Sequence, residues 1–120
     1  MKKLCVCYRI IRRDRNYILG GFISIMKFEW DENKNKINIK KHKIPFEYAI
    51  HVFDDENRIE EYDKYHDEYE ARYQIIGMVN EILFVVVTYI DDDKVRVISA
   101  RKATIKERRK YYGNYYKDFR

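Results

Sequence analysis

The hydrophobic period of the chain changes several times, and each change predicts a boundary between structural elements. Residues 27–30 alternate between apolar and polar and predict a short strand. Asp31 then has the side chain of a good helix N-cap, for a helix that runs through His42. Pro45 suits the first turn of a second helix, where a backbone N–H would be unpaired anyway. Apolar residues recur at helical spacing in this second helix and should be core: Phe46, Ala49, Val52 and Phe53.

The middle of the chain has the pattern of strands. Residues 58–63 alternate and are acidic, as in an edge strand whose charges deter pairing with another chain. Residues 70–80 and 81–90 are rich in apolar and β-branched residues and predict two strands joined in a hairpin near Asn80 and Glu81. The second of these strands is apolar enough to be central in a sheet.

A further strand and a helix complete the predicted fold. Residues 95–100 alternate again, and Thr104 and Glu107 have the spacing of a capping box that opens a C-terminal helix. This order of elements predicts an α+β fold. We expect an antiparallel four- to five-stranded sheet packed with two N-terminal helices and one C-terminal helix.

Charge is distributed unevenly along the 120 residues, whose formal net charge is +5. An aromatic content of 16% is typical of a folded chain, and the length suits one domain. Residues 1–25 have a net charge of +5, residues 54–70 of −7 and residues 94–120 of +8. Such a dipolar protein can steer a polyanion towards one face.

Residues 1–25 differ from the rest in composition, and Gly20 and Gly21 separate them from the strand predicted at residues 27–30. We interpret them as an N-terminal extension upstream of a functional start at Met26, which leaves residues 26–120 as the domain. The alternative is a real basic arm that pairs with a strand or touches nucleic acid.

The two cysteines and the lack of long apolar runs favour a cytoplasmic protein. Cys5 and Cys7 are too close in an extended segment to be good disulfide partners, so we expect free thiols in a reducing compartment. No apolar run approaches the roughly 20 residues that a membrane helix needs, and we expect no membrane partner.

Candidate chemistry rests on cations presented from regular elements. The sequence has no phosphate-binding glycine loop and no histidine pair at metal-ligand spacing, so we expect no metal site. A cluster of arginines could bind RNA and stabilise the charge that builds on a phosphate during cleavage. Alternatively, each arginine is a surface cation that pairs with the acidic strand. The candidates lie on strands, at a strand end and at a helix end: Arg72, Arg96, Arg101, Lys102, Lys41 and His42.

A polar stripe on the first predicted helix has two interpretations. Lys34, Asn38, Lys41 and His42 fall on one helical face. Such a stripe is either a solvated face or the lining of a site.

Four sequence blocks occur in order within residues 26–112: FEWDENKNKINIKKH, FEYAIHVFDD, EARYQIIGMVNEILFVVVTY and VRVISARKATIKERRKYY. In these blocks the chain resembles BrnT toxins, the ribonuclease partners of type II toxin–antitoxin pairs, which share the RelE-like fold. The resemblance implies a metal-independent endoribonuclease that needs no cofactor, cleaves RNA and inhibits translation. It also implies a BrnA-type ribbon-helix-helix antitoxin, whose DNA-binding dimer recruits the toxin to operator DNA and represses their shared operon.

The resemblance also assigns roles to individual residues. Lys41 and His42 match the family's helix-end K-H, Glu70 and Arg72 its E-x-R, and Arg101 with Lys102 the end of its S-A-R-K block. The implied reaction is attack of an RNA 2′-hydroxyl on its adjacent phosphate. Arg72 and Arg101 would converge on that phosphate, Glu70 or His42 would take the 2′ proton, and Lys41 would assist the leaving group. Lys102, Arg96 and Tyr89 are expected to bind RNA, Tyr89 either by stacking on a base or only as a core or rim residue.

Two other functions stay open on the sequence alone. One is a non-enzymatic nucleic-acid-binding module that uses the basic C-terminal helix, and the other is a degenerate toxin that acts as a co-repressor. Residues Asp91 to Asp93 depart from the family pattern, which has a basic residue after the long apolar strand. Three carboxylates would repel RNA unless this turn points away from the site.

Overall fold

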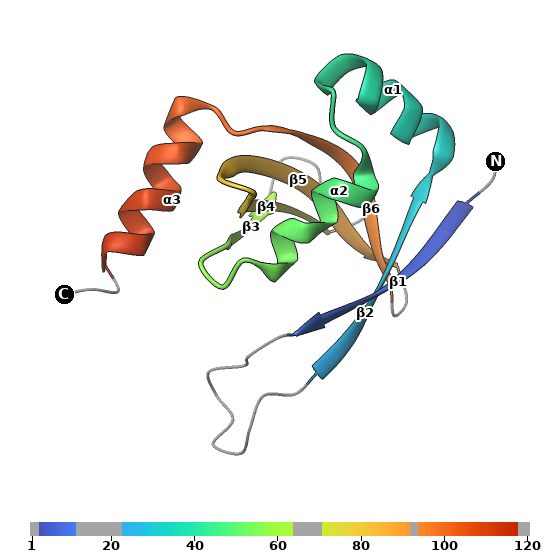
Figure 1. Ribbon diagram of the computed structural model, residues 1–120, viewed down its shortest axis with the longest axis horizontal. Coiled ribbons are helices and arrows are strands. Elements are labelled where there is room, and N and C mark those ends of the chain that lie inside the picture. Colours follow the sequence, from blue (N-terminus) through green and yellow to red (C-terminus); the bar gives the residue numbers. More distant parts are fainter. Residues whose placement is uncertain (1–2, 12–22, 64–70, 92–93, 118–120) are drawn as a thin grey trace.

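The computed structural model describes residues 3–11, 23–63, 71–91 and 94–117. Its elements follow the predicted order, preceded by one further strand (Figure 1). They are β1 (Lys3–Ile11), β2 (Ile23–Asp31), α1 (Glu32–His42), α2 (Phe46–Ala49), η1 (Ile50–Asp54), β3 (Ile59–Asp63), β4 (Arg72–Val79), β5 (Ile82–Asp91), β6 (Lys94–Lys102) and α3 (Ile105–Lys117).

The strands form one six-stranded sheet in the order β1-β2-β6-β5-β4-β3. The predicted α+β class is confirmed and the five predicted strands form, with β1 as an additional sixth strand, but the prediction that the sheet is antiparallel is wrong. Strand β2 runs parallel to β6, while the other neighbouring strands are antiparallel. The helices α1, α2 and η1 and the strands β3 to β5 lie between β2 and β6 in sequence, and so long a connection permits the parallel direction.

Strand β1 forms one edge of the sheet and pairs with β2 along all nine of its residues. The second interpretation of residues 1–25, an arm that pairs with a strand, describes this arrangement. Met26 lies inside β2, which is longer than the strand predicted at residues 27–30. That Met26 is the functional start stays a prediction.

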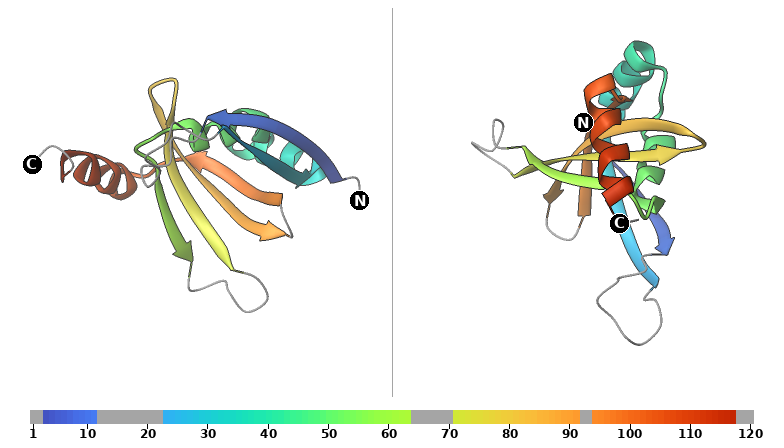
Figure 2. Two further views of the ribbon diagram at one scale, coloured as in Figure 1. Left: turned by 90° about the horizontal axis from the view of Figure 1, so that it is seen from below. Right: turned by 90° about the vertical axis from the view of Figure 1, so that its left-hand side faces the viewer.

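The main core lies between one face of the sheet and the helices α2 and η1. The four predicted core residues of this helical segment, Phe46, Ala49, Val52 and Phe53, are at most 5% exposed. A smaller core lies on the other face, where Tyr111 of α3 packs on residues of β4 and β5. Helix α3 and the β1–β2 pair lie at opposite ends of the molecule (Figure 2).

Two local features fix the centre of the sheet. At Gly77 of β4, a Cβ atom would lie 2.7 Å from Cβ of Val52, so only glycine lets η1 pack this closely on the sheet. Asn80 and Glu81 have φ angles of 48° and 69°, as in a type I′ turn, which confirms the predicted hairpin between β4 and β5.

Candidate active site

Helix α1 ends beside the end of strand β6. Its N-cap is Asp31, as predicted, and the side chain of Asp31 accepts a hydrogen bond of 2.8 Å from the backbone N–H of Asn33. Lys43 ends the helix in the left-handed conformation, with φ of 61°. The last turn carries Lys41 and His42, and cations are favourable there because the helix dipole is negative at this end.

Asn38 joins α1 to β6. Its amide accepts a hydrogen bond of 3.1 Å from the backbone N–H of Ala100 and donates one of 2.9 Å to the carbonyl of the same residue. It also donates to the carbonyl of Ile44 at 3.0 Å. Asn38 is only 6% exposed. The polar stripe predicted on this helix therefore fits neither interpretation completely. Its asparagine neither faces solvent nor lines the pocket, but makes a buried structural contact.

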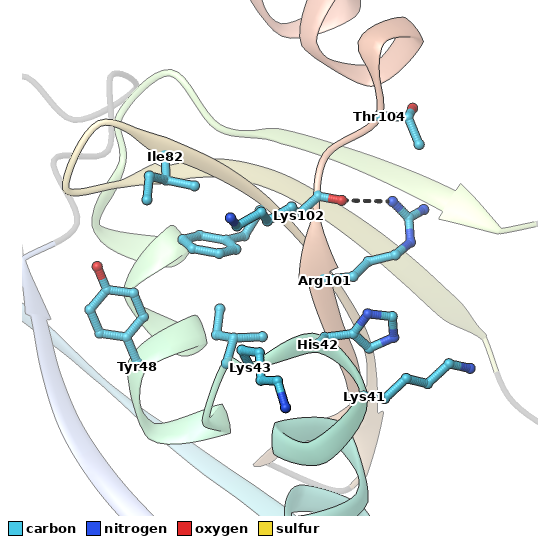
Figure 3. Close-up of a pocket in the computed structure, with 10 residues that line it drawn as sticks. Lys41, His42, Lys43, Tyr48, Ile82, Arg101, Lys102 and Thr104 are labelled. Carbon is cyan, nitrogen blue, oxygen red and sulfur yellow. Dashed lines mark hydrogen bonds between the residues drawn. The ribbon is translucent and has the colours of Figure 1, made fainter.

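A pocket of about 600 Å³ opens where the ends of α1 and β6 meet α2 and β5 (Figure 3). Four of the eight predicted site residues line it. They come from two segments far apart in sequence: Lys41 and His42 from α1, and Arg101 and Lys102 from β6. In Figure 3, His42 lies between Lys41 and Arg101.

The pocket has two sides of different chemistry. We call one the cationic side, formed by Lys41, His42, Lys43, Arg101 and Lys102. We call the other the apolar side, formed by Ile44, Tyr48, Ile82 and Phe84. Thr104, the residue before α3, completes the lining.

Arg101 is held by the first turn of α3. Its Nη1 and Nη2 donate to the two carboxylate oxygens of Glu107 at 2.7 and 2.9 Å. Thr104 and Glu107 form the predicted capping box, since the N–H of Thr104 donates to Glu107 at 2.8 Å and the N–H of Glu107 donates back to the Thr104 hydroxyl at 3.3 Å. The capping carboxylate thus also positions the guanidinium.

This pair shifts the titration of both groups. The hydrogen bonds from Arg101 lower the pKa of Glu107 to about 2, against the opposing effect of burial, and the bonds from Thr104 add to this shift. The hydrogen bond to Glu107 likewise raises the pKa of Arg101. Both groups are therefore charged at neutral pH.

One edge of the Arg101 guanidinium stays available to a ligand. Nη1 also donates to the carbonyl of Lys102 at 3.3 Å, whereas Nε–H and the second hydrogen of Nη2 have no acceptor among the residues that the structure describes. These two N–H groups lie on the same side of the planar guanidinium. They can donate together to two oxygens of a phosphate.

Three other predicted residues form a separate row on the sheet. Arg72 of β4 lies opposite Tyr89 of β5, and Tyr89 lies opposite Arg96 of β6. Arg101 lies opposite Val85, four residues from Tyr89 along β5, which corresponds to roughly 13 Å at the usual rise of a strand. Arg72 therefore does not line the pocket that contains Arg101.

Carboxylates accompany the arginines of this row. Nη1 of Arg96 lies 3.4 Å from a carboxylate oxygen of Glu29, and the two side chains are only 13% and 4% exposed. Asp63 lies opposite Arg72 in the register of β3 and β4. Arg96 also lies over the ring of Tyr89, with its guanidinium carbon 6.0 Å from the ring centroid. Arg96 is therefore held by a buried carboxylate and an aromatic ring, on a part of the sheet that does not line the pocket.

Some predictions fall outside the described residues. Glu70, the second candidate base, and Asp92 and Asp93 are among these positions. The sequence reasoning in turn missed Glu107 as the partner of Arg101, although the capping spacing that places it was recognised.

Within the described part of the chain, no three His, Cys, Asp or Glu side chains gather as ligands for one metal ion. No helix in those residues is long and apolar enough to cross a membrane.

The search of curated proteins gave no match. The family model described as "Ribonuclease toxin, BrnT, of type II toxin-antitoxin system" matches residues 30–107, which is well over half of the chain and contains the whole pocket lining. The chain therefore belongs to the BrnT family of ribonuclease toxins of type II toxin–antitoxin systems.

Proposed function

We propose that this ribonuclease toxin cleaves RNA at the cationic side of the pocket, without a metal ion. The 2′-oxygen of one ribose attacks the adjacent phosphorus, and the bond from phosphorus to the 5′-oxygen of the next nucleotide breaks. The products are a 2′,3′-cyclic phosphate and a 5′-hydroxyl. A base takes the 2′ proton, and an acid supplies a proton to the 5′-oxygen.

Arg101 is proposed to bind the scissile phosphate through its Nε and Nη2 edge. The observation that carries this proposal is the geometry of the Arg101–Glu107 pair, which fixes the guanidinium and leaves that edge without a protein acceptor in the described chain. Preorganised donors stabilise the charge that develops on the phosphate at little reorganisation cost. Lys102 and Lys41, on the same pocket, add positive charge for binding and for protonating the leaving oxygen.

His42 is proposed as the group that takes the 2′ proton. Its ring lines the pocket next to Arg101 and makes no hydrogen bond with the described residues, so both ring nitrogens are available. Glu70 remains the alternative base. The Arg72–Tyr89–Arg96 row is proposed to contact RNA away from the cleaved bond. It lies on the same sheet as Arg101, so neighbouring phosphates of an RNA strand bound at the pocket could reach it.

The wider role is proposed from the family. We infer a cytoplasmic toxin of RelE-like fold, formed by residues 26–120, that inhibits translation by cutting RNA. Its antitoxin is proposed to be of the BrnA ribbon-helix-helix type and to bring the toxin to operator DNA.

The test is cleavage of single-stranded RNA by the purified chain in EDTA, with analysis of the product ends. Replacing Arg101 by alanine should lower kcat/KM by about 100- to 1,000-fold, and His42→Ala by about 100- to 10,000-fold. Arg72→Ala should mainly raise KM. Lys106→Ala, an exposed residue of α3 outside the pocket, is the matched control and should leave cleavage unchanged.

Each other outcome points to a different function. Loss of cleavage in EDTA, or unchanged cleavage by Arg101→Ala, contradicts the proposed mechanism. RNA binding without any cleavage by the unaltered chain supports the non-enzymatic module. Repression with the antitoxin but no cleavage supports the degenerate toxin.

A further inference from the structure

We propose that the apolar side of the pocket binds one unpaired nucleobase of the RNA, next to the phosphate that is cleaved. This inference rests on the proposed function, since it adds a base-binding site to the proposed phosphate site. Ile44, Tyr48, Ile82 and Phe84 form the apolar side. In Figure 3, Tyr48 and Ile82 lie across the pocket from Lys41 and Arg101.

The apolar side has a buried floor and open walls. Ile44 and Phe84 are 3% and 4% exposed, while Ile82 is 43% exposed although it belongs to a strand. A planar apolar ligand can therefore contact the exposed isoleucine on one side and the aromatic surface on another. The volume of about 600 Å³ falls within the range of roughly 300–1,000 Å³ that is usual for ligand pockets.

The aromatic wall is held in a fixed orientation. The ring of Tyr48 packs edge-on against Phe84, with centroids 6.0 Å apart and an interplanar angle of 88°. Its hydroxyl accepts a hydrogen bond of 3.0 Å from Nδ2 of Asn80, in the turn between β4 and β5. Because the ring is already ordered, a base that contacts it does not have to order it, and binding is stronger for that reason.

The two sides of the pocket lie next to each other, as one nucleotide requires. Phe84 of the apolar side pairs with Lys102 of the cationic side across β5 and β6, so their side chains are direct neighbours on the sheet. A nucleotide carries its base and its phosphate on one ribose. RNA bases are accessible to such a surface only when they are unpaired, which is how proteins usually read single-stranded RNA.

An apolar side chain of the antitoxin is the competing occupant. The position of the apolar side beside Lys102 favours a nucleotide, because its base can contact the apolar side while its phosphate contacts the cationic side. The experiment must nevertheless measure both ligands.

The test combines a protein substitution with removal of one base. The probe is a short single-stranded RNA that the protein cuts once, made non-cleavable by a 2′-deoxyribose at the cleaved step. In a series of such probes, each position near that step is in turn made abasic. Ile82→Ser is the test variant, because Ile82 is partly exposed and its loss should not prevent folding. Ile90→Ser is the matched control, at an isoleucine of the same strand that is 59% exposed and outside the pocket.

We expect an abasic site at one position beside the cleaved step to weaken binding to the unaltered chain by roughly 5- to 100-fold. The same abasic site should weaken binding to Ile82→Ser by much less, because the contact is already lost, and binding to Ile90→Ser by as much as to the unaltered chain. Tyr48→Leu should behave like Ile82→Ser.

Two results overturn the base site. The first is that the abasic series shows no effect tied to Ile82: either no abasic position weakens binding more than the others, or one position weakens binding to Ile82→Ser as much as binding to the unaltered chain. The second is that Ile82→Ser weakens antitoxin binding and leaves RNA binding unchanged. Both are distinct from failure of the proposed function, which shows as an absence of cyclic-phosphate ends when the cleavable RNA is used.

Discussion

Glu107→Gln is the substitution that tests how Arg101 is held. The glutamine has nearly the same shape, and its one oxygen can still accept from the N–H of Thr104 and from Nη1 of Arg101. It loses the negative charge and the acceptor for Nη2, because an amide nitrogen only donates. In the folded protein the pKa of Glu107 is lowered from 4.5 to about 2, first by the hydrogen bonds from Arg101. A carboxyl group whose pKa is depressed on folding stabilises the fold above its unfolded pKa, and this stabilisation is lost as the pH falls towards its folded pKa.

The size of the effect follows from the shift and from the exposure of the pair. Fully counted, the lowered pKa corresponds to about 3 kcal/mol of stability at neutral pH. Solvent screening reduces this value, because the Arg101 side chain is 35% exposed, although that of Glu107 is only 16% exposed. We therefore expect Glu107→Gln to lower the free energy of unfolding by about 1–2 kcal/mol near neutral pH.

The assay is urea unfolding of both proteins across a pH series. The difference in stability should be largest above the unfolded pKa of 4.5 and should shrink by more than half near pH 3, where the unfolded carboxyl is already protonated. The control is Glu61→Gln, which removes an ion pair with Lys110, whose side chain is 54% exposed. That variant should lose only about 0–1 kcal/mol.

Two results would refute the reasoning about Glu107. The first is a stability difference that does not change with pH, which would mean that the loss comes from packing rather than charge. The second is a loss no greater than that of the Glu61 control. In either case Glu107 would not hold Arg101 by its charge.

Two further substitutions test the packing around the site. Gly77→Ala should lower the free energy of unfolding by about 1–3 kcal/mol in urea unfolding, because the added Cβ would clash with Val52. The control is Gly113→Ala, whose Cβ would have nothing within 4 Å and which should be neutral or stabilising by up to about 1 kcal/mol. Equal losses for the two variants would contradict this. Asn38→Ala should cost about 2–4 kcal/mol by leaving both backbone groups of Ala100 without partners, and a loss below about 1 kcal/mol would contradict that.

The elements were predictable because their ends carry local signals. Asp31 caps α1, the Thr104–Glu107 box opens α3, and Asn80 and Glu81 make the hairpin turn. Each signal acts within a few residues, so the sequence alone can reveal it. The parallel pairing of β2 with β6 joins segments more than sixty residues apart, and no local pattern reports it.

The site was predictable only in part, for the same physical reason. The residue types placed Lys41, His42, Arg101 and Lys102 in one candidate set, and the structure brings these four to one pocket. The apolar side was missed because Tyr48 looks like an ordinary helical residue when its neighbours in space are unknown.

The buried asparagine explains why the helix end and the strand end meet at all. Strand β6 pairs with β2 only from Lys94 to Arg96, so no described strand pairs with the rest of β6 on that side. An unpaired strand edge needs partners for its backbone groups. The Asn38 amide supplies them at Ala100, in the way a neighbouring strand would. Lys41 comes about one helical turn after Asn38, and Arg101 comes directly after Ala100, so this one contact brings both cations to the same pocket.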